Sequence, residues 1–220
     1  MFALFATIAT GGAIAQVRGG TFVNDSTAAR DTLLTLDDRV RSGNLTEAAR
    51  SLQGLLDNEA SRLLVTENDP DLFRSVRSAV HAALLERPEL LEIYAEITEP
   101  DARAALDRGE HRAVERTMLL TASGFEAALR TAQELLERGR FHAAWRTLMQ
   151  LENHPLRDQP GPGREAAELA SIAVAYLAPM PDPDADPGAG PDDGPDADEQ
   201  TPASIASRWA REAGLPGAEP

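Results

Sequence analysis

Apolar residues recur every three or four positions from residue 31 to residue 178, and this spacing constrains the fold more than any other feature of the sequence. An α-helix brings positions i, i+3, i+4 and i+7 to one face, whereas a half-buried strand alternates strictly. The spacing therefore predicts a series of amphipathic helices. The clearest apolar stripes are Leu45, Ala48, Ala49, Leu52, Leu55 and Leu56; Leu72, Phe73, Val76, Val80 and Leu84; Phe125, Ala128, Leu129, Ala132, Leu135 and Leu136; Phe141, Ala144, Trp145, Leu148 and Leu151; and Leu169, Ile172, Ala173 and Tyr176.

Composition favours an all-α class and argues against several kinds of functional site. Hydrophobic residues make up 42% of the chain and are mostly Leu and Ala, which favour helices over strands. The absence of cysteine excludes a disulfide framework, a thiolate metal site and a cysteine nucleophile. The net charge of −15 argues against nucleic-acid binding as the main role. All 21 basic residues are arginines, which we attribute to base composition rather than to selection for bidentate contacts.

Several residues predict where helices begin and end. Residues 44–47 and 123–126 begin with Asn or Ser and end with Glu, which is capping-box spacing. Pro70 and Pro100 each follow an acidic residue, and proline is favoured in the first turn of a helix. Breaks between helices are expected at three glycines, Gly43, Gly109 and Gly139.

The segments 42–49, 108–114 and 138–144 align with one another. Each has a glycine that ends a helix, a polar residue, a bulkier side chain and small residues that begin the next helix. This pattern resembles the tetratricopeptide repeat. The spacing is uneven, with 30 residues from Gly109 to Gly139 and 66 from Gly43 to Gly109. The expected fold is therefore a degenerate tetratricopeptide-like α-solenoid of antiparallel helix hairpins.

A closer resemblance rests on residues 73–77, 88–94 and 102–109 and covers roughly residues 32–156. Their order and spacing are similar to the helical N-terminal region of secreted planctomycete-type proteins, in which a tetratricopeptide-like region precedes a propeller of the pyrroloquinoline-quinone-dehydrogenase-like kind. The resemblance implies that this chain is the N-terminal part of such a protein or a relative that lost the propeller. No blade-like strand repeats occur here, so neither the propeller nor a quinone cofactor is carried over.

The chain divides into five expected parts. Residues 1–15 are uncharged and apolar and end in a small-x-small pattern, which predicts a secretory signal peptide and export to the periplasm or medium; a buried first helix is the alternative. A flexible lead of 16–30 precedes the helical domain of 31–178. Residues 179–202 hold seven Pro and seven Asp and predict a disordered linker. Residues 203–220 predict a short helix around 205–211, with Trp209 on its apolar side, and a tail that is truncated.

No residue carries an assignable chemistry. The four histidines, His81, His111, His142 and His154, lack the spacing of a helical zinc site, and His111 and His142 are expected at the surface beside turns. Acidic pairs at 37–38 and at 96 and 99 fit a solvated helix face better than catalysis. The aspartates of 182–198 fit a solvated linker better than a calcium site. The sequence thus predicts no enzyme, no catalytic, cofactor or metal residues, and no membrane span.

The leading functional hypothesis is a non-catalytic interaction or spacer module of an exported protein, because stacked helix pairs create a groove for a peptide or a neighbouring domain. The partner is a protein or peptide of unknown identity, and the surface that binds it is also unknown. The alternatives are the helical preamble of a propeller enzyme and a calcium-responsive secreted protein. The largest aromatic residues near the best repeat, Phe125, Phe141 and Trp145, are expected in the core rather than in a ligand patch.

Overall fold

The computed structural model describes residues 26–65, 73–177 and 201–215. These ranges are mainly helical and contain one antiparallel sheet of two short strands, in which Leu63 pairs with Ser75 and Val65 with Phe73. The elements are α1 (Thr27–Leu34), α2 (Leu36–Arg41), α3 (Leu45–Glu59), β1 (Leu63–Val65), β2 (Phe73–Ser75), α4 (Val76–Leu85), α5 (Pro88–Asp107), α6 (His111–Thr117), α7 (Ala122–Glu137), α8 (Phe141–Met149), α9 (Pro162–Ala175) and α10 (Pro202–Glu212). The all-α class is confirmed, whereas the small sheet was not predicted.

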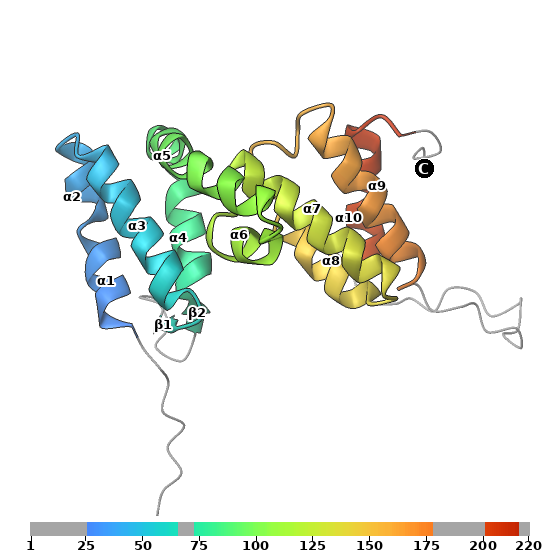
Figure 1. The fold of residues 1–220 in the computed structure, drawn as a ribbon, viewed down its shortest axis with the longest axis horizontal. Helices are drawn as coiled ribbons and strands as arrows, with labels where there is room; N and C mark the ends of the chain where they lie inside the picture. The colour runs from blue at the N-terminus through green and yellow to red at the C-terminus, as the bar shows by residue number, and fades with distance from the viewer. Residues whose placement is uncertain (1–25, 66–72, 178–200, 216–220) are drawn as a thin grey trace, which may run out of the picture.

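The helices follow one another along the long axis of the molecule, from α1 and α2 at one end to α9 and α10 at the other (Figure 1). Each helix contacts the next helix in sequence, and α3, α5, α7 and α9 also contact one another in succession. Each apolar stripe is therefore covered by helices that lie close by in the sequence. This arrangement explains how short helices without long-range crossovers bury a core.

The three glycines that were expected to end helices do so. Gly43, Gly109 and Gly139 follow α2, α5 and α7 with positive φ angles of 77°, 80° and 68°. In each turn the residue after the glycine donates its amide hydrogen to the carbonyl five residues earlier, as from Glu110 to Ala105. This is the Schellman arrangement, which needs a left-handed residue that glycine adopts without strain. The predicted turns are confirmed, and α10 ends in the same way at Gly214.

Two large apolar clusters form the core. The first lies between α3, α4 and α5 and includes Leu52 and Tyr94, both fully buried. The second lies between α7, α8, α9 and α10 and includes Phe125 and Trp209, each 2% exposed. A smaller cluster between α5, α6 and α7 connects them. The chain thus has one continuous row of helices with a core distributed along its length.

The helix start that was predicted at Pro100 is wrong. Pro100 lies inside α5, and Pro88 occupies the first turn of this helix instead. Tyr94, Thr98 and Ala102 are all buried on the same face, so one apolar stripe continues on both sides of Pro100. The burial of this stripe outweighs the lost backbone hydrogen bond that an interior proline imposes.

Helix α4 begins later than predicted. Pro70 and Leu72 lie outside the described residues, and Phe73 belongs to β2, where it is 40% exposed. The helix starts at Val76, and the Ser75 hydroxyl accepts a hydrogen bond from the Ser78 amide at 3.1 Å. The serine cap therefore sets this boundary rather than the upstream proline.

The two predicted capping boxes are wrong in detail. Thr121, not Ser123, caps α7 and accepts from the Gly124 amide at 2.9 Å. Ser123 lies inside the helix, and its hydroxyl donates to Glu99 of α5 at 2.6 Å. Asn44 occupies the N-cap position of α3 but makes no side-chain cap hydrogen bond. The residue spacing predicted approximately where α3 and α7 begin. It could not show which hydroxyl caps its own helix and which one contacts another helix.

Both boundaries of the predicted helical domain need correction. Helix α1 begins at Thr27, within the expected flexible lead, and the buried Ser26 hydroxyl accepts from the Ala29 amide at 3.0 Å. At the other end, α10 is longer than expected and packs against α9, with Trp209 buried in the second cluster. The C-terminal helix is therefore part of the domain.

Helix α9 buries a different face from the one its larger residues predict. Ile172 is 46% exposed and Tyr176 is 66% exposed, whereas Ala166, Ala170 and Ala173 are fully buried. Small side chains allow α8 and α10 to approach α9 closely, so the alanine stripe takes the buried side. The prediction assigned the large residues to the buried face, because the sequence alone does not show how closely neighbouring helices pack.

Candidate functional site

Four adjoining depressions lie on the surface of the described residues. The first, which we call the arginine pocket, has a volume of about 420 Å³ and is lined by Arg77, Arg112, Arg116, Arg140, Arg146 and residues of α7. It shares Arg77 and Gln150 with a second depression of about 530 Å³, the histidine pocket, which contains His81 and His154. A third depression continues from His154 to a C-terminal pocket beside α10. Because neighbouring depressions share lining residues, they lie next to one another along the surface, and we refer to them together as the groove.

The arginine pocket follows from the two glycine turns. Helices α6 and α8 each follow a turn at Gly109 or Gly139, and both pack against α7. Helix α8 places Ala143, Arg146 and Thr147 on one face by their helical spacing, and α7 contributes Thr131 and Leu135 between the two flanking helices. The pocket therefore has a partly apolar lining and basic side chains.

Most arginines outside this pocket have an acidic partner. Arg87 lies 2.6 Å from Asp37, Arg103 lies 2.9 Å from Glu126, and other pairs of this kind occur along the chain. In the arginine pocket, Arg112 pairs with Glu134 at 3.0 Å, whereas Arg77 donates to the uncharged Gln150 at 3.3 Å.

The remaining three arginines of the pocket carry uncompensated charge. The side chains of Arg116, Arg140 and Arg146 make no hydrogen bond or ion pair with the described residues, and all three are exposed. Glu115, the acid that lines the pocket, accepts instead from the Gln150 amide at 3.3 Å. A chain of net charge −15 thus concentrates positive charge in one depression, which favours the binding of anions.

The histidine pocket contains one buried imidazole, His154, and one partly buried imidazole, His81, and the pKa of each is lowered. Burial lowers the pKa of His154 from 6.5 to about 4. Burial also lowers the pKa of His81 to about 4, with smaller contributions from the charges of Arg77 and His154. The His81 Nε2 atom is buried and has no hydrogen-bond partner among the described residues. Both rings are therefore neutral near pH 7, and they add no charge to the groove.

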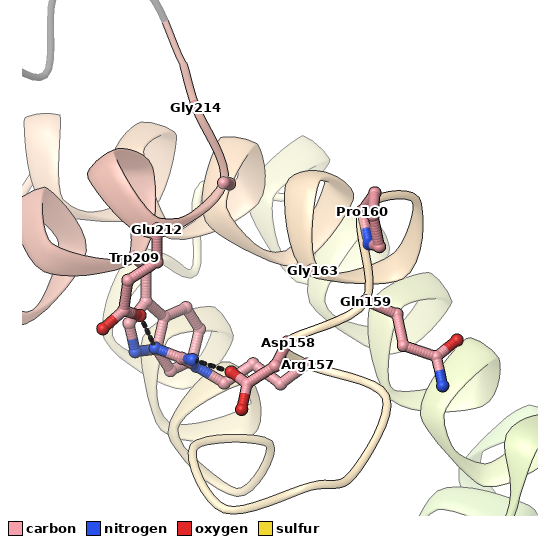
Figure 2. A pocket seen from close by; sticks show the side chains of 9 residues that line it. Arg157, Asp158, Gln159, Pro160, Gly163, Trp209, Glu212 and Gly214 are labelled. Atoms are coloured by element: carbon pink, nitrogen blue, oxygen red, sulfur yellow. Dashed lines mark hydrogen bonds and ion pairs between the residues drawn. The ribbon is translucent and has the colours of Figure 1, made fainter.

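The C-terminal pocket, of about 550 Å³, is built around Arg157 (Figure 2). The guanidinium carbon lies 4.9 Å from the centre of the Trp209 ring, and the group forms ion pairs with Asp158 and Glu212. Figure 2 shows these two carboxylates on either side of the guanidinium group. Through its contacts with Glu212 and Trp209, Arg157 connects the loop before α9 to α10. Because two carboxylates compensate its charge, the pocket offers no net positive charge to a ligand.

The remaining histidines and the aromatic residues that the sequence singled out have roles in packing or at helix turns. His111 lies 3.0 Å from Glu134, and His142 is exposed beside the Gly139 turn, as expected. Phe125 and Trp145 are buried, which confirms their core position, whereas Phe141 is only partly buried and stacks on Tyr176 with ring centres 4.3 Å apart.

Three of the four singled-out acidic residues make structural contacts, whereas Glu96 is exposed on α5. Asp37 and Asp38 pair with Arg87 and Arg41, and Glu99 accepts from Ser123. The aspartates of residues 182–198 lie outside the described residues. Sequence reasoning missed the arginine pocket, because its residues are far apart in the chain and no local motif connects them.

The described ranges add neither a metal site nor a membrane-spanning helix. The described ranges contain no group of three or more His, Cys, Asp or Glu residues that could hold a metal ion. Nor does any helix in those ranges have the length and apolarity required to cross a membrane. Comparison with protein-family models, curated proteins and solved structures finds no match to this chain.

Proposed function

We propose that this chain is a non-catalytic protein-binding module and that its arginine pocket binds an acidic segment of a partner protein. The observation that carries the proposal is the exposure of three arginines without acidic partners, Arg116, Arg140 and Arg146, around one depression. A guanidinium group donates two parallel hydrogen bonds to a carboxylate, so an acidic peptide matches this surface in charge and in geometry.

The architecture suits this role. We propose a degenerate tetratricopeptide-like solenoid, supported by the hairpins at Gly43, Gly109 and Gly139 and by the successive contacts of α3, α5, α7 and α9. In such arrays each hairpin contacts its neighbours and the stack presents an extended binding surface. The groove that continues from the arginine pocket past His154 gives room for several residues of a peptide.

The expected affinity is modest and sensitive to salt. An exposed ion pair contributes only about 0.2–1 kcal/mol, so several arginines must contribute together. Screening weakens exposed pairs at high ionic strength.

A fluorescein-labelled nonapeptide of Glu and Gly tests the proposal by fluorescence anisotropy. The double variant R140A/R146A removes two arginines of the pocket, and R50A/R211A is the matched control, because Arg50 and Arg211 are exposed, lie outside the groove and make no ion pair among the described residues. We expect the dissociation constant to rise about tenfold for R140A/R146A and to stay unchanged for the control. Equal weakening by both variants would contradict the proposal.

Export through residues 1–15 and a relationship to propeller-bearing proteins stay predictions, as does the absence of catalysis. The calcium alternative depends on residues 182–198, which lie outside the described residues. No contact of the described residues favours either alternative function over the binding of a protein segment.

A further inference from the structure

The arginine pocket lies close to the point at which the chain leaves α9. The Tyr176 ring, just after α9, stacks on the Phe141 ring at the start of α8, with ring centres 4.3 Å apart. Arg140, which lines the pocket, directly precedes Phe141 in the chain. In Figure 1 the end of α9 lies beside the turn between α7 and α8. The residues that follow Leu177 therefore start next to the pocket.

The chain also returns close to α8. Trp209 of α10 and Trp145 of α8 have ring centres 6.5 Å apart, and α10 begins at Pro202. An α-helix rises 1.5 Å per residue, so Pro202 lies roughly 10 Å along α10 from Trp209. Residues 178–200, which lie outside the described residues, are thus attached at both ends to helices that contact α8.

The segment 179–200 carries a charge opposite to that of the arginine pocket. It contains seven Asp, one Glu and no basic residue. Asp182, the first of these acids, follows Tyr176 by six residues, and an extended chain covers about 3.3 Å per residue, so Asp182 can reach roughly 20 Å from the end of α9. Arg146 follows Phe141 by five residues, which is only about 8 Å along α8. The acids of the segment can therefore reach the arginines of the pocket.

Attachment to the same chain makes weak binding sufficient. A short flexible tether holds a ligand at an effective concentration on the order of millimolar. A segment whose carboxylates bind the pocket with a dissociation constant of that size would occupy it about half of the time. An acidic segment of a partner protein would then have to compete with it.

We propose that the chain's own acidic segment, residues 179–200, docks on the arginine pocket and competes with the acidic segment of a partner. Arg116, Arg140 and Arg146 are exposed and have no acidic partner among the described residues, and the carboxylates of this segment supply acceptors for them. This inference rests on the proposed function, since both acidic segments use the same arginines. A partner must therefore displace the attached segment in order to bind.

A spin label within the segment tests the docking by nuclear magnetic resonance. The chain lacks cysteine, so Ala189→Cys creates a single attachment site for a nitroxide. In the ¹⁵N-labelled chain, we expect paramagnetic broadening to remove more than about half of the amide intensity of α6 around Arg116 and of α8 around Arg146. R140A/R146A should restore most of this intensity, whereas the control R50A/R211A should restore none.

Two controls exclude other causes of broadening. Replacement of the eight acids of 179–200 by Asn or Gln keeps the tether and removes the charges, so it should restore the intensity as R140A/R146A does. Broadening that neither change reduces would reflect mere proximity of the label and would overturn the inference. A ¹⁵N-labelled chain without nitroxide, mixed with a spin-labelled chain without ¹⁵N, should show no broadening. Broadening in this mixture would assign the docked segment to a second copy and overturn docking within one chain.

The Glu-containing nonapeptide separates failure of this inference from failure of the proposed function. In excess, the peptide should restore the intensity lost in α6 and α8, because it displaces the docked segment. In the chain with the eight neutralised residues, R140A/R146A should weaken the peptide by a larger factor than in the unmodified chain, because no attached segment competes. Weakening by the same factor in both chains, with broadening insensitive to R140A/R146A, would overturn the inference and leave acidic-peptide binding intact. No weakening in the neutralised chain would overturn both.

Discussion

The Nε2 atom of His154 lies 3.1 Å from the carbonyl oxygen of Leu119 and joins the loop after α8 to the turn before α7. The Nδ1 atom of the same ring accepts from the Leu156 amide at 3.1 Å, so Nε2 carries the hydrogen and the ring is neutral. A second proton would place a donor opposite the Leu156 amide. The histidine pocket is therefore held together by an uncharged imidazole.

This relationship predicts that the fold loses stability in mild acid. The pKa values of His81 and His154 are lowered to about 4 by burial, whereas an unfolded histidine titrates near 6.5. The unfolded chain therefore binds more protons between these values, and the free energy of unfolding falls as the pH drops from about 6.5 to about 4. Each histidine accounts for a decrease on the order of 3 kcal/mol at the acid end of this window.

Urea unfolding between pH 7.5 and pH 4 measures this decrease. His81→Leu should remove roughly half of the histidine contribution, whereas His142→Gln should leave the profile unchanged, because His142 is exposed. Identical pH profiles for the unmodified chain and His81→Leu would contradict the account.

Two glycines should respond to alanine in opposite directions. A Cβ atom at Gly163 would lie 1.8 Å from the Arg157 carbonyl oxygen, whereas at Gly54 nothing lies within 4 Å. Gly163→Ala must displace the start of α9 and should cost about 1–3 kcal/mol. Gly54→Ala lies inside α3 and should stabilise the chain by up to about 1 kcal/mol. Chemical denaturation checks both, and a gain of stability for Gly163→Ala would mean that α9 does not pack closely on this loop.

Trp209 should hold α10 on the rest of the domain. It is 2% exposed, and the helix is further fixed by ion pairs of Arg157 with Glu212 and of Arg208 with Glu152. Trp209→Ala should cost about 3–5 kcal/mol through lost burial and a cavity. Because α10 lies at the end of the row, hydrogen exchange should rise in α10 and stay slow in α3. Uniformly faster exchange in both helices would show that α10 does not unfold separately.

Much of the fold could be predicted from the sequence because its determinants are local. The apolar stripe from Ala48 to Leu56 and the positive-φ glycines act within a few residues, and the structure confirms both. The errors arose where a distant partner decides the outcome. Pro100 lies inside a helix because α5 buries one face on both sides of it. Ser123 was predicted to cap α7, but its hydroxyl donates to Glu99 of α5 instead.

The candidate site could not be predicted in the same way. Arg77, Arg116 and Arg146 come from three different helices, and each fits a solvated surface when read alone. Their shared role depends on which arginines have acidic partners, and that follows from tertiary contacts.

Mapping the bound peptide by nuclear magnetic resonance tests the central claim most directly. Titration of the ¹⁵N-labelled chain with the Glu-containing nonapeptide should shift the amide resonances of α6 and of α8 around Arg146, and these shifts should disappear in R140A/R146A. Amide shifts confined to other helices, or shifts of the same size in the variant, would show that the arginine pocket does not bind the acidic segment.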